Sequence, residues 1–298
     1  MNRREFIKTA VISGAATLIY PGLRNLAAAQ SQYPDIAVVK GHDPARITLS
    51  AVNALGGMKR FVSRGDIVVV KPNIGWNRAP EFAANTNPFV VGAVVRMCLD
   101  AGAGRVKVFD NTCDNAINCY TASGIAAEAK RCGAEVIYME DRKYIEVDIK
   151  GTALKKWPIY KDALDADKII NVPVAKDHGI SRLTLSMKNM MGVMGGRRGK
   201  LHRKMGENLV DMARFMRPAL TILDAVRILT ANGPTGGNLK DVRKLDTVVA
   251  GTDMVAIDSY GATLFGMKGA DLDYVKLGDA VRIGRMDIEN LNIKKMQV

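Results

Sequence analysis

Short apolar runs alternate with helix-like segments along most of this 298-residue chain. The runs IAVV (36–39), IVVV (67–70) and IINVPVA (169–175) are separated by segments of helical periodicity, such as 89–102. Strands that are apolar at every position are buried on both faces, which is typical of parallel sheets covered by helices on both sides. The alternation therefore predicts an α/β fold with a mainly parallel sheet flanked by helices on both faces, in Rossmann-like layers.

Further elements follow the same pattern. Asn87 and Pro88 are suited to starting the helix at 89–102, because Asn is a favoured cap residue and Pro fits the first helical position. Strands are also predicted at 105–110, 135–140, 167–175, 219–227 and 245–251, and helices at 44–55, 122–133 and 253–266.

The N-terminus has the order of an export signal. Arg3 and Arg4 precede an apolar run (10–23) and then a stretch of small residues, which is typical of a twin-arginine signal peptide. We expect residues 1–29 to be removed, which leaves 30–298 as a single α/β domain. The protein is then predicted to use the twin-arginine translocase as a partner and to reside in the periplasm.

A retained membrane anchor is the alternative for this segment. The run at 10–23 contains Gly14, Pro21 and Gly22. It is also shorter than the roughly 20 apolar residues that a membrane-spanning helix needs. Both features favour cleavage over an anchor.

The charge balance favours an anionic partner. The chain holds 43 Lys and Arg against 30 Asp and Glu, a formal net charge of +13. Such a field attracts nucleic acid, acidic lipid or small anions. Export and an aromatic fraction of only 6% argue against nucleic acid, because single-strand binding relies on aromatic stacking platforms. A small anionic ligand is therefore expected.

The four cysteines do not form a cluster motif. Cys98, Cys113, Cys119 and Cys132 contain no C-x-x-C pair, so the chain carries no iron–sulfur or zinc-ribbon motif and its cofactor is unknown. Cys98 and Cys132 fall in helical patterns and are expected to be buried. Cys113 and Cys119 lie in one loop, where they could form a disulfide or remain free thiols. We expect a disulfide after export if the two side chains face each other.

Polar residues follow several predicted strands at the point where each strand ends. In open α/β sheets ligands bind outside the carboxyl ends of the strands. A common site is therefore expected from the residues found there: Lys71, Asn73, Asp110, Asn111, Lys176, His178, Asp224 and Asp253.

The stretch 171–206 is expected to form one wall of that site. Thr184, Lys188 and Met191 are predicted near one helical face, and Lys188 and Asn189 lie close to glycines that allow close backbone approach. The segment 195–204 is predicted to be a flexible cationic loop that folds over an anion, with the side chains of Arg197, Arg198, Lys200, His202, Arg203 and Lys204. A solvated basic loop without a ligand is the alternative. The phosphate-binding glycine motifs of nucleotide sites are absent from the sequence.

Several of these segments together resemble one known family. VVVKPN, CLDAGAGRVKVFD, NVPVAKDHG, TLSMKNMMGVMGG, KLHRK, ILDAVR, NGPTGG and GTDMVAIDSYGATLFG occur in the order of the domain-of-unknown-function 362 family, across about 66–266. The resemblance implies an α/β protein; some members are joined to ferredoxin modules, whose cysteine run this chain lacks, so electron transfer would need a separate redox partner protein. By the same resemblance the family's polar motif positions are Lys71, Asn73, Lys176, His178, Lys188, Asn189, His202 and Asp224.

These residue types suit three kinds of function. In the first, Lys71, Lys176 and Lys188 neutralise a small carboxylate or phosphate while His178 or His202 moves a proton. Substrate binding is then assigned to Asn73, Asn189, Arg197, Arg198, Lys200 and Asp224. In the second, both histidines hold a metal with Asp110 or Asp224, which the surrounding lysines disfavour. In the third, the same cations dock an acidic redox partner without catalysis.

The signal peptide leads to a first prediction. The mature chain should begin within residues 30–33, because the small residues before that point resemble a processing site. N-terminal sequencing of the exported protein checks this. An intact Met1 on exported protein would contradict cleavage.

Overall fold

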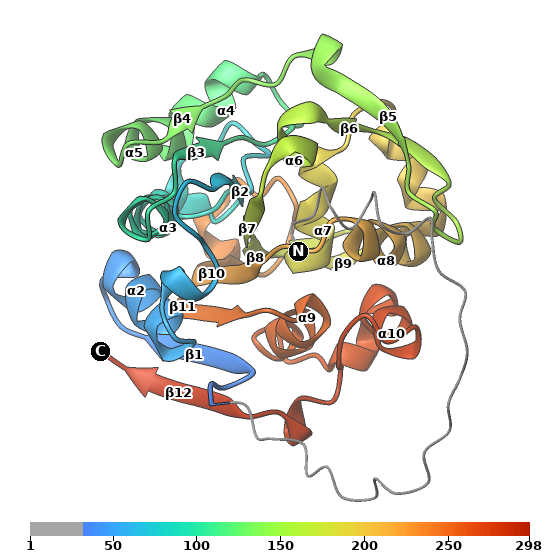
Figure 1. Ribbon diagram of the computed structural model, residues 1–298. Helices are drawn as coiled ribbons and strands as arrows, with labels where there is room; N and C mark the ends of the chain where they lie inside the picture. The colour runs from blue at the N-terminus through green and yellow to red at the C-terminus, as the bar shows by residue number, and fades with distance from the viewer. Residues whose placement is uncertain (1–31) are drawn as a thin grey trace, which may run out of the picture. The chain divides into compact units, whose positions relative to one another are not determined.

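A ten-stranded sheet forms the centre of the protein in the computed structural model, which describes residues 32–298. The twin-arginine segment predicted at 1–29 lies outside the described residues. The main path of the sheet runs in the order β12 (Ile293–Gln297), β1 (Ile36–Lys40), β11 (Val242–Gly251), β10 (Leu220–Leu229), β7 (Lys168–Val172), β2 (Ile67–Pro72), β3 (Arg105–Val108) and β4 (Glu135–Val136). Figure 1 shows these strands running across the molecule.

The predicted mainly parallel sheet is confirmed. β10, β7, β2, β3 and β4 pair in parallel, as do β1 and β12. Along the main path β11 alone runs antiparallel to both of its neighbours, β10 and β1. The carboxyl end of β11 therefore lies at the opposite edge of the sheet from the ends of β2 and β3.

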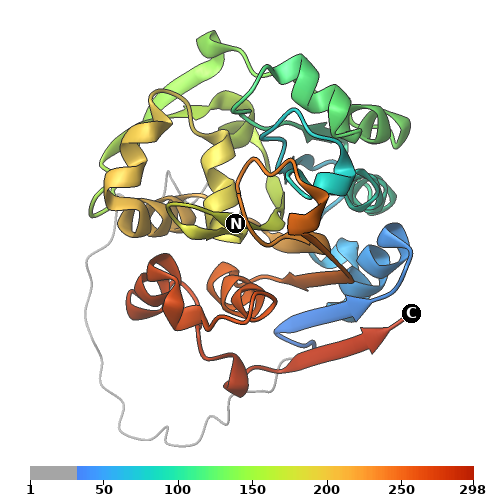
Figure 2. The same ribbon diagram turned by 180° about the vertical axis from the view of Figure 1, so that it is seen from behind.

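Helices cover both faces of the sheet, as expected (Figures 1 and 2). One face carries α2 (Pro44–Ala54), α3 (Pro88–Asp100) and α5 (Ile125–Arg131); the other carries α7 (Ser186–Asn189), α8 (Met205–Phe215), α9 (Met254–Thr263) and α10 (Asp273–Ala280). β2 shows how the two cores are divided. Val68 and Val70 pack into one hydrophobic cluster while Val69, between them, packs into the other.

Two predicted helix starts are confirmed with their caps. Asn87 precedes α3, and its side-chain oxygen accepts a hydrogen bond from the backbone N of Phe89 at 2.9 Å. Asp43 caps α2 in the same way, through the backbone N of Ala45 at 2.9 Å. Pro occupies the beginning of both helices, where its missing N–H costs no hydrogen bond.

Other expected boundaries are wrong for local reasons. The segment 167–175, predicted as one strand, forms two strands. Pro173 lacks the N–H that would continue the hydrogen-bond ladder, so β7 ends before it. β8 (Val174–His178) begins after it and pairs with β10 and with β9 (Arg182–Thr184). The strand expected at 135–140 is shorter than predicted and consists of β4 alone. The helix expected from 122 is divided at Gly124, whose φ of 70° lies in the left-handed region, between α4 (Ala116–Ala122) and α5.

Two further segments differ from the expectation. The cationic segment predicted as a flexible loop forms the 3₁₀-helix η5 (Arg198–Lys204). A two-stranded hairpin of β5 (Tyr144–Asp148) and β6 (Lys156–Tyr160), followed by α6 (Lys161–Asp165), stands apart from the main sheet. None of the helices in the described part of the chain combines the length and apolar character needed to cross a membrane.

Candidate functional site

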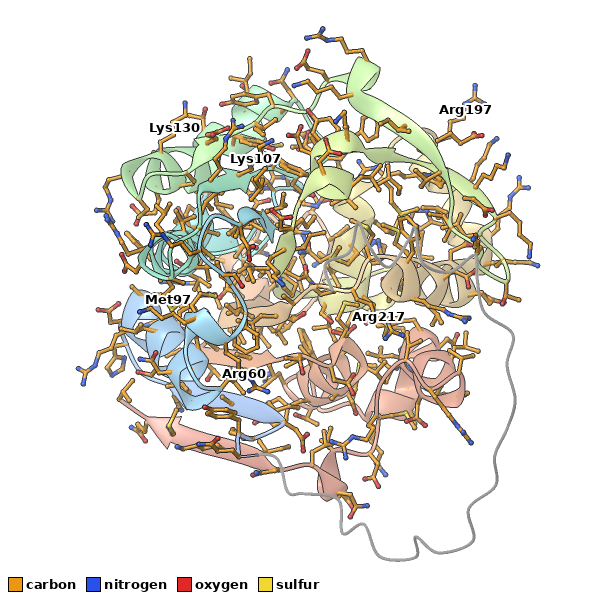
Figure 3. All side chains as sticks on the ribbon, in the orientation of Figure 1. Arg60, Met97, Lys107, Lys130, Arg197 and Arg217 are labelled. Carbon is orange, nitrogen blue, oxygen red and sulfur yellow. The ribbon has the colours of Figure 1, made fainter. Side chains whose placement is uncertain are left out.

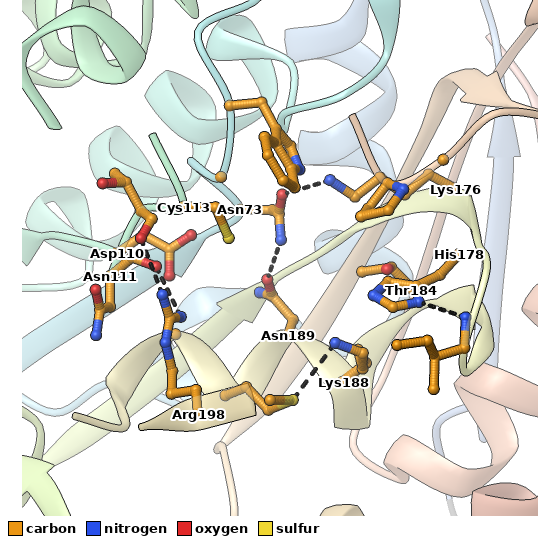
Figure 4. A pocket seen from close by; sticks show the side chains of 18 of the residues that line it. Asn73, Asp110, Asn111, Cys113, Lys176, His178, Thr184, Lys188, Asn189 and Arg198 are labelled. Carbon is orange, nitrogen blue, oxygen red and sulfur yellow. Dashed lines mark hydrogen bonds between the residues drawn. The ribbon is translucent and has the colours of Figure 1, made fainter. Parts of the chain in front are cut away.

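A cavity of about 620 Å³ opens at the carboxyl ends of β2, β3 and β8, and we call it the basic pocket (Figure 4). β2 brings Lys71 and Asn73 to it, and β8 brings Lys176 and His178. Its wall also includes residues that follow β3 or lie on α7, on the 3₁₀-helix η4 (Met190–Val193) or on η5: Asp110, Asn111, Thr112, Cys113, Lys188, Asn189, Met191, Gly192, Arg198, Gly199 and His202. The structure thus brings together most of the residues that the strand-end pattern selected.

Lys71 is a buried cation at the base of this pocket. Its Nζ lies 2.7 Å from Oδ1 of Asp110 and donates to the carbonyl oxygen of Pro72 at 2.8 Å. Asp110 is held in turn by the backbone N of Ile74, which donates to its Oδ2 at 2.6 Å. Burial lowers the pKa of Lys71, although the Asp110 charge opposes that shift.

Two side-chain amides connect Lys71 to Lys176, and a third, Asn171, supports them. Oδ1 of Asn189 accepts from Lys71 Nζ at 3.0 Å and from Asn73 Nδ2 at 3.1 Å, while its Nδ2 donates to Asn171 Oδ1 at 2.8 Å. Oδ1 of Asn73 then accepts from Lys176 Nζ at 3.0 Å. Every amide orientation is fixed by these partners, so the two ammonium groups are held at defined positions.

Lys176 is as deeply buried as Lys71 but has no carboxylate beside it. Its Nζ donates to neutral oxygens only, Oδ1 of Asn73 and the carbonyl of Ala84. Burial lowers the pKa of Lys176 to about 7, and the charges of Lys188 and Lys71 push it in the same direction. Near neutral pH both the ammonium and the neutral amine forms of this group are therefore populated.

Lys188 extends into the pocket from α7. Its Nζ lies 3.4 Å from Sδ of Met191, and within residues 32–298 no oxygen acceptor is placed at that ammonium group. Burial lowers the pKa of Lys188 to about 8, and Arg198 and Lys71 act in the same direction. Among the cations that line the pocket, Lys188 has the fewest groups that compensate its positive charge.

Asp258 of α9 positions the helix that carries Lys188. Its carboxylate accepts from the backbone N of Ser186 at 2.6 Å and of Met187 at 3.0 Å, the first residues of α7. Burial raises the pKa of Asp258 to about 7. Sequence reasoning missed this residue, although an aspartate within the apolar helix pattern AIDSYG is an unusual placement that could have drawn notice.

The two pocket histidines are held in opposite tautomers. Nδ1 of His178 accepts from the backbone N of Ile180 at 3.1 Å and of Ser181 at 3.3 Å, so its hydrogen is on Nε2. Nδ1 of His202 lies 3.1 Å from the carbonyl oxygen of Gly199 and must donate to it, which leaves Nε2 without a hydrogen in the neutral ring. Burial lowers the pKa of His178 to about 3, so it stays neutral. The rings stack with centroids 6.2 Å apart.

The loop cations do not behave alike. Arg198 lines the pocket and donates to the carbonyl oxygens of Asn111 and Thr112, each at 2.9 Å, so it tethers η5 to the loop after β3. Arg197 and Lys200 are exposed and are not among the residues that line the pocket. Figure 3 shows Arg197 extending outward from the ribbon. Of the six side chains of this segment expected to fold over an anion, Arg198 and His202 line the pocket, and the other four do not.

The comparisons with known proteins agree with the motif order. The model of the domain of unknown function DUF362 matches residues 68–263, which include every residue that lines the basic pocket. The chain belongs to this family. The thylakoid-associated protein sll1697 of Synechocystis sp. is 29% identical to this DUF362 protein in an alignment of 212 residues, which covers 68% of this chain and 64% of that protein. The chain thus spans less than two thirds of that relative's length.

Solved structures show distant likeness only. The lactate racemase apoprotein from Thermoanaerobacterium thermosaccharolyticum aligns with a TM-score of 0.42 and 10% identity, over 72% of this chain and 54% of that one. A Thermotoga maritima protein aligns with a TM-score of 0.41 and 9% identity, over 81% and 60%.

Two carboxylates expected at the site lie elsewhere. Asp224 is buried in β10, where it accepts from the backbone N of Asn87 at 2.7 Å and of Val226 at 2.9 Å, and it does not line the pocket. Burial raises the pKa of Asp224 to about 6. Asp253 caps α9 at the opposite edge, because β11 is antiparallel. Neither residue can contact a ligand in the basic pocket.

The metal alternative is not assembled by this geometry. In the described part of the chain, no three or more His, Cys, Asp or Glu side chains are grouped so that they could hold a metal ion. Asp110 is paired with Lys71, and Asp224 lies outside the pocket.

The expected disulfide is also absent from this DUF362 protein. Cys113 and Cys119 are both free; Cys113 is exposed at the pocket, whereas Cys119 is buried and its Sγ lies 3.7 Å from the carbonyl oxygen of Gly75. Cys98 and Cys132 are buried, as expected.

Gly192 allows the Lys71–Asp110 pair to form. A Cβ at this position would overlap the Asp110 carboxylate and the Lys71 ammonium group, both of which are buried. Gly192→Ala should therefore disrupt the pair and lower the free energy of unfolding by about 3 kcal/mol. Denaturant unfolding measures this loss. Gly199→Ala is the matched control, because nothing lies within 4 Å of a Cβ there; equal stability of the two variants would contradict the argument.

Proposed function

We propose that this DUF362 protein is an exported enzyme that binds a small carboxylate or phosphate in the basic pocket and transfers a proton to or from it. The observation that carries the proposal is the Lys188 ammonium group, which is largely buried and faces the pocket without an anionic partner from residues 32–298. A buried cation without compensation is costly unless a ligand supplies the opposite charge.

The charge arrangement supports a single small anion. Lys71 is already balanced by Asp110, and Lys176 is solvated by neutral oxygens. Lys188 and Arg198 remain as positive groups that face the cavity. An anion placed between them would form charge-assisted hydrogen bonds and offset the burial, and the lesser repulsion, that lower the lysine pKa values.

The histidine tautomers support a division of roles. His202 presents an unprotonated Nε2 and is suited to accept a proton, while His178 presents an Nε2–H that can only donate. His178, fixed by two backbone amides, would polarise a substrate oxygen together with Lys188, and His202 would act as general base.

Export is part of the proposal and draws on the paired arginines and the apolar run at the N-terminus. The twin-arginine translocase carries folded proteins, so the pocket would be complete before it reaches the periplasm. The cleaved form is favoured over a retained anchor for the reasons given above.

Docking of an acidic redox partner is the second candidate. Arg197, Lys200, Arg203 and Lys204 are exposed on or beside η5, outside the pocket interior, and they form a cationic surface of their own. This surface would serve a protein partner, whereas the buried lysines would serve a small ligand. The two candidates therefore differ in which cations they need.

Lys188→Met tests the anion site. This change keeps much of the side-chain bulk but removes the charge, and it should weaken binding of a pocket anion by roughly 2 to 5 kcal/mol. Isothermal titration with inorganic phosphate and with malonate measures the effect. Lys200→Met, an exposed cation outside the pocket, is the control and should change the affinity little. Similar losses in both variants, or none in either, would contradict a site centred on Lys188.

The same binding should depend on pH. Only protonated lysines attract the anion, and the pKa values of Lys176 and Lys188 are lowered to about 7 and about 8. Affinity should therefore be highest below these pKa values and decline as the pH rises through 7 to 9. Titrations across this range check the sign; an affinity that rises with pH would exclude lysine as the anion's partner.

His202→Gln tests the acid–base role. Malonate and pyruvate have acidic C–H bonds, and loss of the base should slow solvent deuterium uptake into them by about 10²-fold or more. NMR of the two probes in D₂O measures the uptake. His42→Gln is the control, because the His42 side chain is 94% exposed and lies away from the pocket. Wild-type exchange no faster than buffer would favour the docking candidate.

A further inference from the structure

Cys113 is a free thiol at the wall of the basic pocket. It lies in the loop between β3 and α4, and Figure 4 shows its sulfur among the labelled pocket side chains. The loop is held on both sides of the thiol. The backbone N of Cys113 donates to the carbonyl oxygen of Gly75 at 2.8 Å, and Arg198 binds the two preceding carbonyl oxygens at 2.9 Å each.

The pocket cations line the same cavity as this thiol. Lys71, Lys176 and Lys188 are all among the lining residues, as is Cys113. Positive groups at this range attract anionic reagents and stabilise negative charge that develops on sulfur during thiol exchange. Lys188, whose ammonium group has no anionic partner within residues 32–298, is a second reason to expect negative charge in this cavity.

We propose that Cys113 is a covalent modification site selective for small anionic disulfides. The Cys113 sulfur, after losing its proton, attacks one sulfur of the disulfide; the S–S bond of the reagent breaks, one half leaves as a thiolate, and the other half stays bound to Cys113 as a mixed disulfide. The disulfide reagent is itself the oxidant. The bound half places its negative groups among the lysines and blocks the pocket reversibly.

Cys119 is poorly suited to reverse this adduct. It is buried, its Sγ lies 3.7 Å from the Gly75 carbonyl oxygen, and burial raises its pKa to about 11. At neutral pH it therefore remains a thiol, which is a weak attacking group. The mixed disulfide at Cys113 should persist rather than convert to a Cys113–Cys119 bond.

The inference rests on the proposed anion pocket for its charge selectivity, but the two can fail separately. Cys113→Ser should abolish modification while phosphate binding stays close to wild type. Lys188→Met should weaken phosphate binding and also reduce the selectivity of Cys113. Loss of selectivity with intact phosphate binding would overturn only the thiol proposal.

The experiment measures charge selectivity at a single thiol. The full chain is treated with iodoacetate, which is anionic, or iodoacetamide, which is neutral, and labelling of the Cys113 peptide is followed by mass spectrometry in native and denatured protein. Folding should raise the iodoacetate-to-iodoacetamide rate ratio by about 10-fold, and about 1 M salt should remove most of this gain. A ratio that folding leaves unchanged would overturn the proposal.

A second arm uses the proposed chemistry itself. Oxidised glutathione, which is anionic, should give a mixed disulfide at Cys113 faster than cystamine, which is cationic, and dithiothreitol should restore phosphate binding. Cys119→Ser is the control and should form the same adduct. Faster reaction with cystamine, or conversion of the adduct to an intramolecular Cys113–Cys119 disulfide, would contradict the proposal.

Discussion

The buried ammonium group of Lys71 is the constraint around which the pocket is organised. A charge at the end of a central strand, fully enclosed by protein, is very unfavourable unless an opposite charge and several hydrogen-bond acceptors surround it. Asp110 supplies the charge, and the Pro72 carbonyl and Asn189 complete the shell. Gly192 leaves the space in which they meet. The end of β3, α7 and the backbone at 192 thus all contribute to the surroundings of one cation.

The strand ends that form this shell could be predicted from the sequence, because parallel strands with continuous apolar runs bring their carboxyl ends to one edge. Lys71, Asn73, Lys176 and His178 were located in this way, and the pocket contains all four. The same reasoning failed for Asp253. An apolar run does not reveal strand direction, and β11 is antiparallel. The prediction also failed for Asp224, because a carboxylate within a strand can accept hydrogen bonds from backbone amides in the interior.

The sequence pattern could not identify the roles of residues that act through contacts with the backbone. Arg198 and Arg197 are adjacent and chemically identical, yet one binds two carbonyl oxygens at the pocket wall and the other is exposed. Nothing in their spacing separates them, because η5 was expected to be a loop. The histidine roles depend in the same way on the Ile180 and Ser181 amides and on the Gly199 carbonyl, which only the folded backbone brings to the rings.

The pKa shifts of two buried carboxyl groups and two buried lysines make their combined cost to stability greatest near neutral pH. Burial raises the pKa values of Asp224 and Asp258 to about 6 and about 7, so the native state holds more protons than the unfolded chain below these values and loses stability as the pH rises towards them. Burial lowers the pKa values of Lys176 and Lys188 to about 7 and about 8, so above these values the unfolded chain holds more protons and stability rises with pH. The two trends meet near pH 7, where the carboxyl groups are ionising, Lys176 is partly deprotonated and Lys188 is still largely charged. An anion in the pocket lowers this cost on the lysine side only, because it stabilises the ammonium forms and leaves Asp224 and Asp258, which point into backbone amides, unchanged.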